Sequence, residues 1–185
     1  MGKPKNKARR KGTAMSKPDI VAAAEARLQE AKGFLYDYRR GQTPNATHTG
    51  LRRAVSGFLN AARIAVRLVE HRDPKWYTAW YDRLPSDGQH LLSLLKDRHG
   101  VEGHEAGVPL KNDHSLLPES KLEVGRDYRG SGFVFRRAMF HDDFNTGEPM
   151  IGVPTLRFDD GEDAWDFGNR CVQLIQGMLA AYKAD

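Results

Sequence analysis

The strongest constraint on the fold is an apolar stripe with helical spacing, which begins near Thr47 and continues to about residue 72. Side chains three or four residues apart share one face of an α-helix, so the stripe predicts a long helix with one buried face. The stripe consists of Leu51, Val55, Phe58, Ala62, Ala65 and Val69. Five arginines of the same segment lie mostly off this face: Arg52, Arg53, Arg63, Arg67 and Arg72.

Four more segments combine helical spacing with typical helix starts, at about residues 17–40, 74–84, 86–98 and 162–179. Ser16 precedes Pro18 and Asp19, an arrangement that favours a helix start. The second of these segments is rich in aromatic side chains, and Trp76 and Trp80 are spaced to lie on one core-facing side of it. Together the five helices predict a helical bundle.

The helical pattern breaks after residue 104. Glycine, proline and asparagine make residues 106–120 typical of a loop. Two strands are expected at residues 133–140 and 150–158, with a turn around residues 145–147 and a third, weaker strand at residues 122–128. The predicted fold class is therefore mainly α, a helical bundle with a small antiparallel β-hairpin or meander inserted before the C-terminal helix.

Composition indicates one soluble globular domain over residues 18–185, with the β insertion around residues 120–160. Hydrophobic residues make up 39% and charged residues 29% of the chain, and no apolar run approaches the roughly 18 residues that span a bilayer. The basic N-terminus has no apolar segment behind it, which argues against a secretory signal. The single cysteine, Cys171, excludes an internal disulfide and is expected in the core. These features favour a cytoplasmic protein.

Positive charge is concentrated in residues 1–17, which contain no acidic residue: Lys3, Lys5, Lys7, Arg9, Arg10, Lys11 and Lys17. Removing these seven from the 29 basic residues leaves 22 against 24 acidic ones, so the body carries about −2 although the whole chain carries +5. With so few apolar residues, this tail is expected to be disordered. It either binds nucleic-acid phosphates through counterion release or is a solvated arm without a specific partner.

The residues best suited to phosphate chemistry are Arg98, His99 and His104. Arg98 is a permanent cation with a planar set of donors, and the two histidines exchange protons near neutral pH. Such a set can bind or cleave a phosphodiester. The alternative is structural: Arg98 pairs with Asp97 or Glu102 at the surface, and His104 donates to a loop carbonyl.

Four segments share a pattern with a known family: Phe58-Leu59-Asn60-Ala61-Ala62-Arg63, Trp80-Tyr81, Leu95-Lys96-Asp97-Arg98-His99 and His104-Glu105. They resemble HEPN-type domains, and more narrowly a loosely characterised group of bacterial HEPN-like proteins. The resemblance covers about residues 18–105. The family signature is an Arg, then Asn, Asp or His, and a His after four to six intervening residues; five residues separate Arg98 from His104.

The resemblance implies a metal-independent RNA endonuclease of the toxin or defence type. In that interpretation His104 acts as general acid or base, Arg98 stabilises charge on the phosphate, and His99 orients the phosphate. A homodimer brings two copies of Arg98 and His104 into one cleft, and a neutralising partner protein is a further expectation.

Two features depart from the family: the inserted β segment, which is not part of the minimal HEPN bundle, and the glycines of the motif. Gly100 and Gly103 lie inside the motif, where each costs a helix about 1 kcal/mol relative to alanine. Proteins of this fold also include inactive members, so the alternative is a non-catalytic helical module that binds nucleic acid or a protein partner. No metal or cofactor is expected, because His99 and His104 are five residues apart, which is not the spacing of a helix-face ligand pair.

Overall fold

A computed structural model of the chain describes residues 15–43, 46–102, 110–118, 140–142 and 149–185. Within them lie five helices: α1 (Lys17–Gly41), α2 (His48–Arg72), α3 (Pro74–Tyr81), α4 (Ser86–Glu102) and α5 (Ala164–Ala184). Three strands form one small sheet: β1 (Leu110–Pro118), β2 (Phe140–Asp142) and β3 (Pro149–Phe158). The predicted mainly α class, with a small antiparallel β element before the C-terminal helix, is confirmed.

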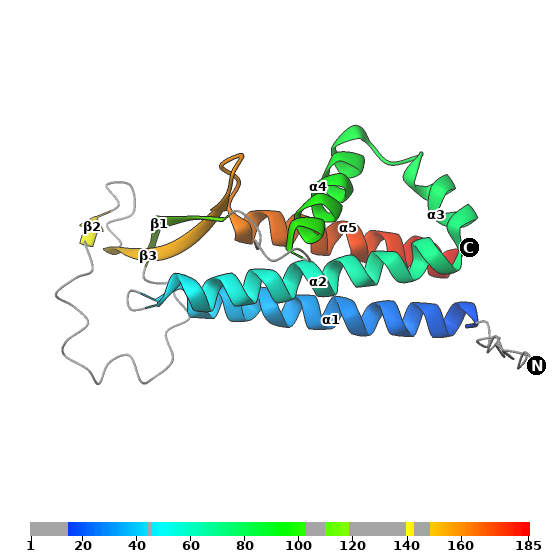
Figure 1. The fold of residues 1–185 in the computed structure, drawn as a ribbon, viewed down its shortest axis with the longest axis horizontal. Helices are drawn as coiled ribbons and strands as arrows, with labels where there is room; N and C mark the ends of the chain where they lie inside the picture. The colour runs from blue at the N-terminus through cyan, green and yellow to red at the C-terminus, as the bar shows by residue number, and fades with distance from the viewer. Residues whose placement is uncertain (1–14, 44–45, 103–109, 119–139, 143–148) are drawn as a thin grey trace, which may run out of the picture.

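The body is built around the antiparallel pair α1 and α2, with α5 alongside them (Figure 1). The apolar stripe predicted for α2 is buried along its whole length. Large side chains that are almost fully buried join these helices, and each contributes about 1.5–3 kcal/mol by burial: Tyr38, Phe58, Leu59, Phe167, Ile175, Met178 and Tyr182. Cys171 is buried among them, as predicted, and burial raises the pKa of its thiol.

Capping side chains explain why the helices begin where the sequence predicts. Ser16 and Asp19 form a capping box at the start of α1. Thr47 caps α2, Asp73 caps α3 and Asp163 caps α5, each through a side-chain oxygen that accepts from a backbone N–H of the first turn. Such a cap is worth about 1 kcal/mol.

The α3 and α4 helices pack against the second half of α2 and against α5. Trp76 and Trp80 stack with ring centroids 6.0 Å apart, and Trp76 also meets Tyr182 edge-on at 4.7 Å. Both tryptophans are half-buried and pack against the core. The described side chains that α4 buries are Leu91, Leu92, Leu95 and Arg98.

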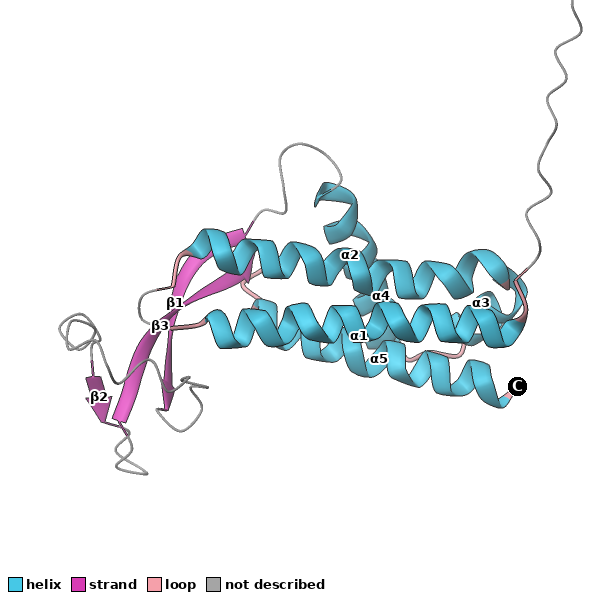
Figure 2. Ribbon diagram, turned by 90° about the horizontal axis from the view of Figure 1, so that it is seen from below, coloured by secondary structure: helices cyan, strands magenta, loops and turns pink. Residues whose placement is uncertain are grey.

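The sheet has strand order β1-β3-β2 with antiparallel pairs, and it extends from one end of the helical body (Figure 2). The predicted strand at residues 150–158 is confirmed as β3. The prediction of a loop at residues 106–120 is wrong for β1, where Leu110 pairs with Phe158. Its polar residues and terminal Pro118 are compatible with a strand at the edge of a sheet, where one side stays open.

The other β predictions fall mostly outside the described residues. Of residues 133–140 only Phe140 is described, as the first residue of β2. The expected strand at residues 122–128 and the turn at residues 145–147 lie outside the described residues. None of the helices described here has the length and apolarity needed to cross a bilayer.

A buried polar network joins the sheet to the helices. The Tyr38 hydroxyl lies 2.9 Å from Thr155 Oγ1 and accepts from the Leu156 backbone N–H. Thr155 Oγ1 also donates to Asp163, the cap of α5, over 2.9 Å. Burial raises the pKa of Tyr38 to about 12. The network therefore fixes β3 against α1 and the start of α5.

Candidate functional site

Arg98 lies in the last turns of α4 and is only 8% exposed. Its Nη2 lies 2.6 Å from an Asp160 carboxylate oxygen and its Nη1 lies 3.1 Å from one of Glu162. The guanidinium carbon lies 3.5 Å from the ring centroid of Phe158 and 4.1 Å from that of Phe167. We call these five residues the Arg98 clamp. It combines charge-assisted hydrogen bonds with cation–π contacts around a buried guanidinium, whose partner Asp160 is half exposed.

The carboxylates of the clamp come from the turn between β3 and α5. Gly161 adopts a φ of 88°, a conformation that side-chain-bearing residues rarely take. An Asp160 carboxylate oxygen accepts from the backbone N–H of Glu162 over 3.0 Å, and Glu162 also pairs with Arg170. The sequence Asp159-Asp160-Gly161-Glu162-Asp163 thus forms a tight turn that presents two acids to α4 and then caps α5.

These contacts correct one sequence interpretation. A surface pair of Arg98 with Asp97 or Glu102 was one expectation, but the side chain is buried and its partners are Asp160 and Glu162. In the HEPN interpretation, the positive charge of Arg98 acts on a phosphate. In the structure, two carboxylates neutralise that charge. A phosphate contact by Arg98 would require both ion pairs to break and the guanidinium to leave the two aromatic rings.

His99 follows directly in the sequence but contacts a different helix. Its Nε2 lies 3.4 Å from the Asn60 side-chain oxygen of α2. Burial lowers the pKa of His99, and the positive charges of Arg63 and Arg67 lower it further. The imidazole is therefore neutral near pH 7, with one nitrogen able to accept a proton.

Asn60, the contact of His99, is the first of a row of polar residues at spacings of three and four on one face of α2: Asn60, Arg63, Arg67 and His71. The buried Arg63 pairs with Glu70 at 2.8 Å. Arg67 is exposed, and its Nε lies 3.3 Å from His71 Nε2. Within the described part of the chain, Arg67 makes no ion pair with a carboxylate. These four residues and His99 form what we call the His99 cluster.

The structure thus separates the predicted site residues. Arg98 belongs to the clamp and His99 to the cluster, whereas His104 lies outside the described residues. The predicted nucleic-acid-binding residues of the tail also lie outside them: Lys3, Lys5, Lys7, Arg9, Arg10 and Lys11. Sequence reasoning placed Arg63 and Arg67 off the apolar stripe without assigning them a role, although their alignment with Asn60 along one helix face was visible.

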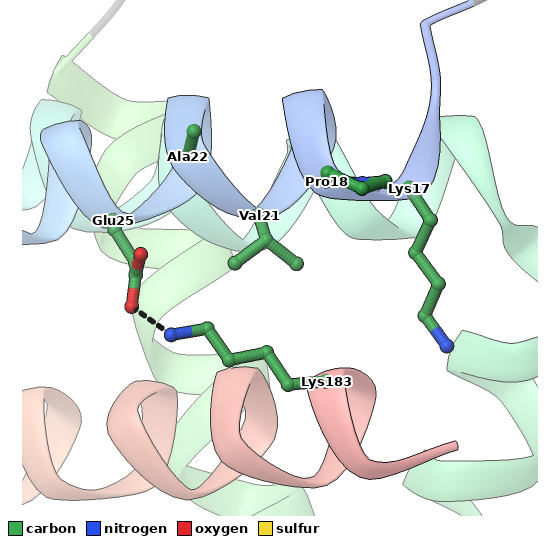
Figure 3. Close-up of a pocket in the computed structure, with 6 residues that line it drawn as sticks. All are labelled: Lys17, Pro18, Val21, Ala22, Glu25 and Lys183. Atoms are coloured by element: carbon green, nitrogen blue, oxygen red, sulfur yellow. Dashed lines mark hydrogen bonds and ion pairs between the residues drawn. The ribbon is translucent and has the colours of Figure 1, made fainter.

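A cavity of about 330 Å³ lies elsewhere, between the start of α1 and the end of α5 (Figure 3). An ion pair of 2.5 Å between Lys183 and Glu25 runs along it. The Lys17 amine lies 4.7 Å from the ring centroid of Tyr182. None of the lining residues belongs to α2 or α4, so this cavity is separate from the clamp and the cluster.

The described residues form five helices and a small sheet, and the side chains of a histidine, an amide and two arginines come from α4 and α2. Comparisons with protein-family models, curated proteins and solved structures find no match to this chain.

Proposed function

We propose that the chain is a non-catalytic, HEPN-like module that binds RNA, with the His99 cluster as the contact for the phosphate backbone. The observation that carries the proposal is the environment of Arg67, an exposed guanidinium that contacts His71, lowers the pKa of His99 by its charge and has no carboxylate partner among the described residues. Guanidinium groups bind phosphate through paired hydrogen bonds. The resemblance to HEPN-type domains favours RNA over DNA.

The Arg98 clamp supports binding rather than cleavage. Stabilisation of a phosphate transition state needs a cation that is aimed at the developing charge and free to meet it. Arg98 instead faces two carboxylates and two aromatic rings. The exposed positive charge that a ligand can reach in the cluster is that of Arg67 on α2.

The basic tail supports the same proposal. Figure 1 shows that α1 begins at the end of the helical body where α2 ends, and Arg67 and His71 lie in the last two turns of α2. The lysines and arginines of residues 1–11 precede α1 in the sequence. These residues concentrate positive charge in the sequence just before α1, and such charge favours nucleic acid through counterion release.

A second candidate function is metal-independent RNA cleavage, and one observation favours it. A neutral imidazole on the same face as an exposed guanidinium is suited to take a proton from a 2′-hydroxyl next to a stabilised phosphate. In this version His99 and the exposed Arg67 carry the roles that the motif assigns to His104 and Arg98.

Fluorescence anisotropy with a labelled single-stranded RNA, at several salt concentrations, tests the proposal. We expect Arg67→Ala to weaken binding about tenfold, since a charge-assisted hydrogen bond is worth about 1.5–3 kcal/mol. The slope of log affinity against log salt should fall by about one.

The matched control is Arg40→Ala, which removes the same charge from an exposed position at the last turn of α1, at the other end of the helical body. Equal effects of the two substitutions, or no binding by the wild-type protein, would contradict the proposal. Incubating the same RNA in EDTA and analysing it on a gel separates binding from cleavage. Cutting that disappears in His99→Ala would establish the second candidate.

A further inference from the structure

The clamp and the cluster are joined by one peptide bond. Arg98 and His99 are consecutive, so their side chains leave α4 about 100° apart. Arg98 reaches the β3–α5 turn, whereas His99 reaches Asn60 of α2. Anything that holds the Arg98 backbone in place also sets where His99 lies.

We infer that the Arg98 clamp is a positioning device, which fixes the last turns of α4 so that His99 meets Asn60 and stays close enough to Arg63 and Arg67 to feel their charges. The clamp is the one buried attachment of α4 beyond Leu95 among its described side chains. The expected effect of the clamp on RNA affinity rests on the proposed function, whereas its effect on the position of His99 does not.

The chemistry of the clamp suits this task. Each carboxylate meets a different nitrogen of the guanidinium, and the ring of Phe158 lies 3.5 Å from its centre. This arrangement restrains the position and orientation of a planar group, which a lysine ammonium does not have. A helix end without such an attachment opens locally at a small free-energy cost.

Substitutions of the two carboxylates provide a test, because loss of their charge lowers the His99 pKa, whereas displacement of His99 raises it. Asp160→Asn with Glu162→Gln removes two negative charges but keeps oxygen atoms that accept from Arg98. Asp160→Ala with Glu162→Ala removes the same two charges and the acceptors as well. Loss of negative charge alone lowers the pKa of His99 in both double variants.

The measurement is an NMR pH titration of the His99 ring in the two double variants of the full chain. We expect a higher His99 pKa in the alanine pair than in the amide pair, because a released helix end moves the imidazole away from Arg63 and Arg67. Equal pKa values in two folded proteins would overturn the inference. If the alanine pair does not fold, Glu162→Ala against Glu162→Gln makes the same comparison.

RNA affinity gives a separate readout. The alanine pair should bind the labelled RNA about three- to tenfold more weakly than the amide pair. If the wild-type protein binds no RNA, the proposed function fails, and the His99 titration still decides whether the clamp positions the histidine. If RNA binds and both double variants match in affinity and in His99 pKa, the clamp has only a structural role.

Discussion

Near the end of α4, positive charge is neutralised by two carboxylates on one side of the helix and acts on His99 on the other. On the side of the β3–α5 turn, Arg98 is buried, paired with two carboxylates and enclosed by two phenylalanines. On the side of α2, His99 lies near two arginines whose charge lowers its pKa. Residues that are adjacent in a sequence motif can therefore belong to different structural units, because a helix turns about 100° per residue.

Of the differences expected between the clamp and the cluster, the largest is in the free energy of unfolding. Arg98→Ala leaves Asp160 and Glu162 without their buried partner and removes the packing on two rings, so we expect a loss of about 3 kcal/mol in the free energy of unfolding. Urea unfolding followed by circular dichroism measures it. His99→Ala serves as the reference and should change stability by less than about 1 kcal/mol. Similar losses for both variants would remove the distinction between clamp and cluster.

A smaller effect is expected for the turn that presents the carboxylates. Gly161→Ala forces an alanine into a φ of 88°, where no neighbouring atom would obstruct the new methyl group. The cost is therefore purely conformational, about 1–2 kcal/mol.

The matched control is Gly177→Ala in α5, where the space is also open but the backbone is helical. There the same substitution should stabilise the protein by up to about 1 kcal/mol. Thermal unfolding of the two variants should show shifts of opposite sign, and two shifts of the same sign would contradict the structure of the turn.

The smallest effect concerns pH. The folded-state pKa of His99 lies below its unfolded value, so the unfolded chain binds more protons as the pH falls through that range. The contribution of His99 to stability is present above the unfolded pKa of about 6.5 and is lost as the pH falls through the folded value.

Arg67→Ala should raise the His99 pKa and flatten this part of the stability profile, because one of the charges that lower the pKa is gone. Unfolding measurements between neutral and mildly acidic pH, on wild-type and Arg67→Ala proteins, detect the change. An identical profile in the two proteins would show that Arg67 does not act on His99.

Features encoded by neighbouring residues were predictable from the sequence. The apolar stripe of α2 and the caps at Ser16, Thr47 and Asp163 lie within a few turns of the helices that they define, so the helices follow from local pattern alone. The edge strand β1 was missed, because its polar residues and its one proline are typical of a loop, and only the pairing with β3 makes the segment a strand.

Long-range contacts explain what the sequence did not reveal about the site. The carboxylates that bind Arg98 follow it by 62 and 64 residues, and no spacing rule links them. Asn60 and His99 are likewise 39 residues apart. The motif interpretation identified the right part of α4, but the division between clamp and cluster depends on how α2, α4 and the β3–α5 turn pack.

The proposal that the His99 cluster binds RNA is tested most directly by an NMR titration of the histidine rings in the free and RNA-bound protein. A phosphate next to His99 favours the protonated ring, so the His99 pKa should rise on RNA binding. An unchanged His99 pKa in a protein that is saturated with RNA would place the nucleic acid elsewhere and contradict the proposed site.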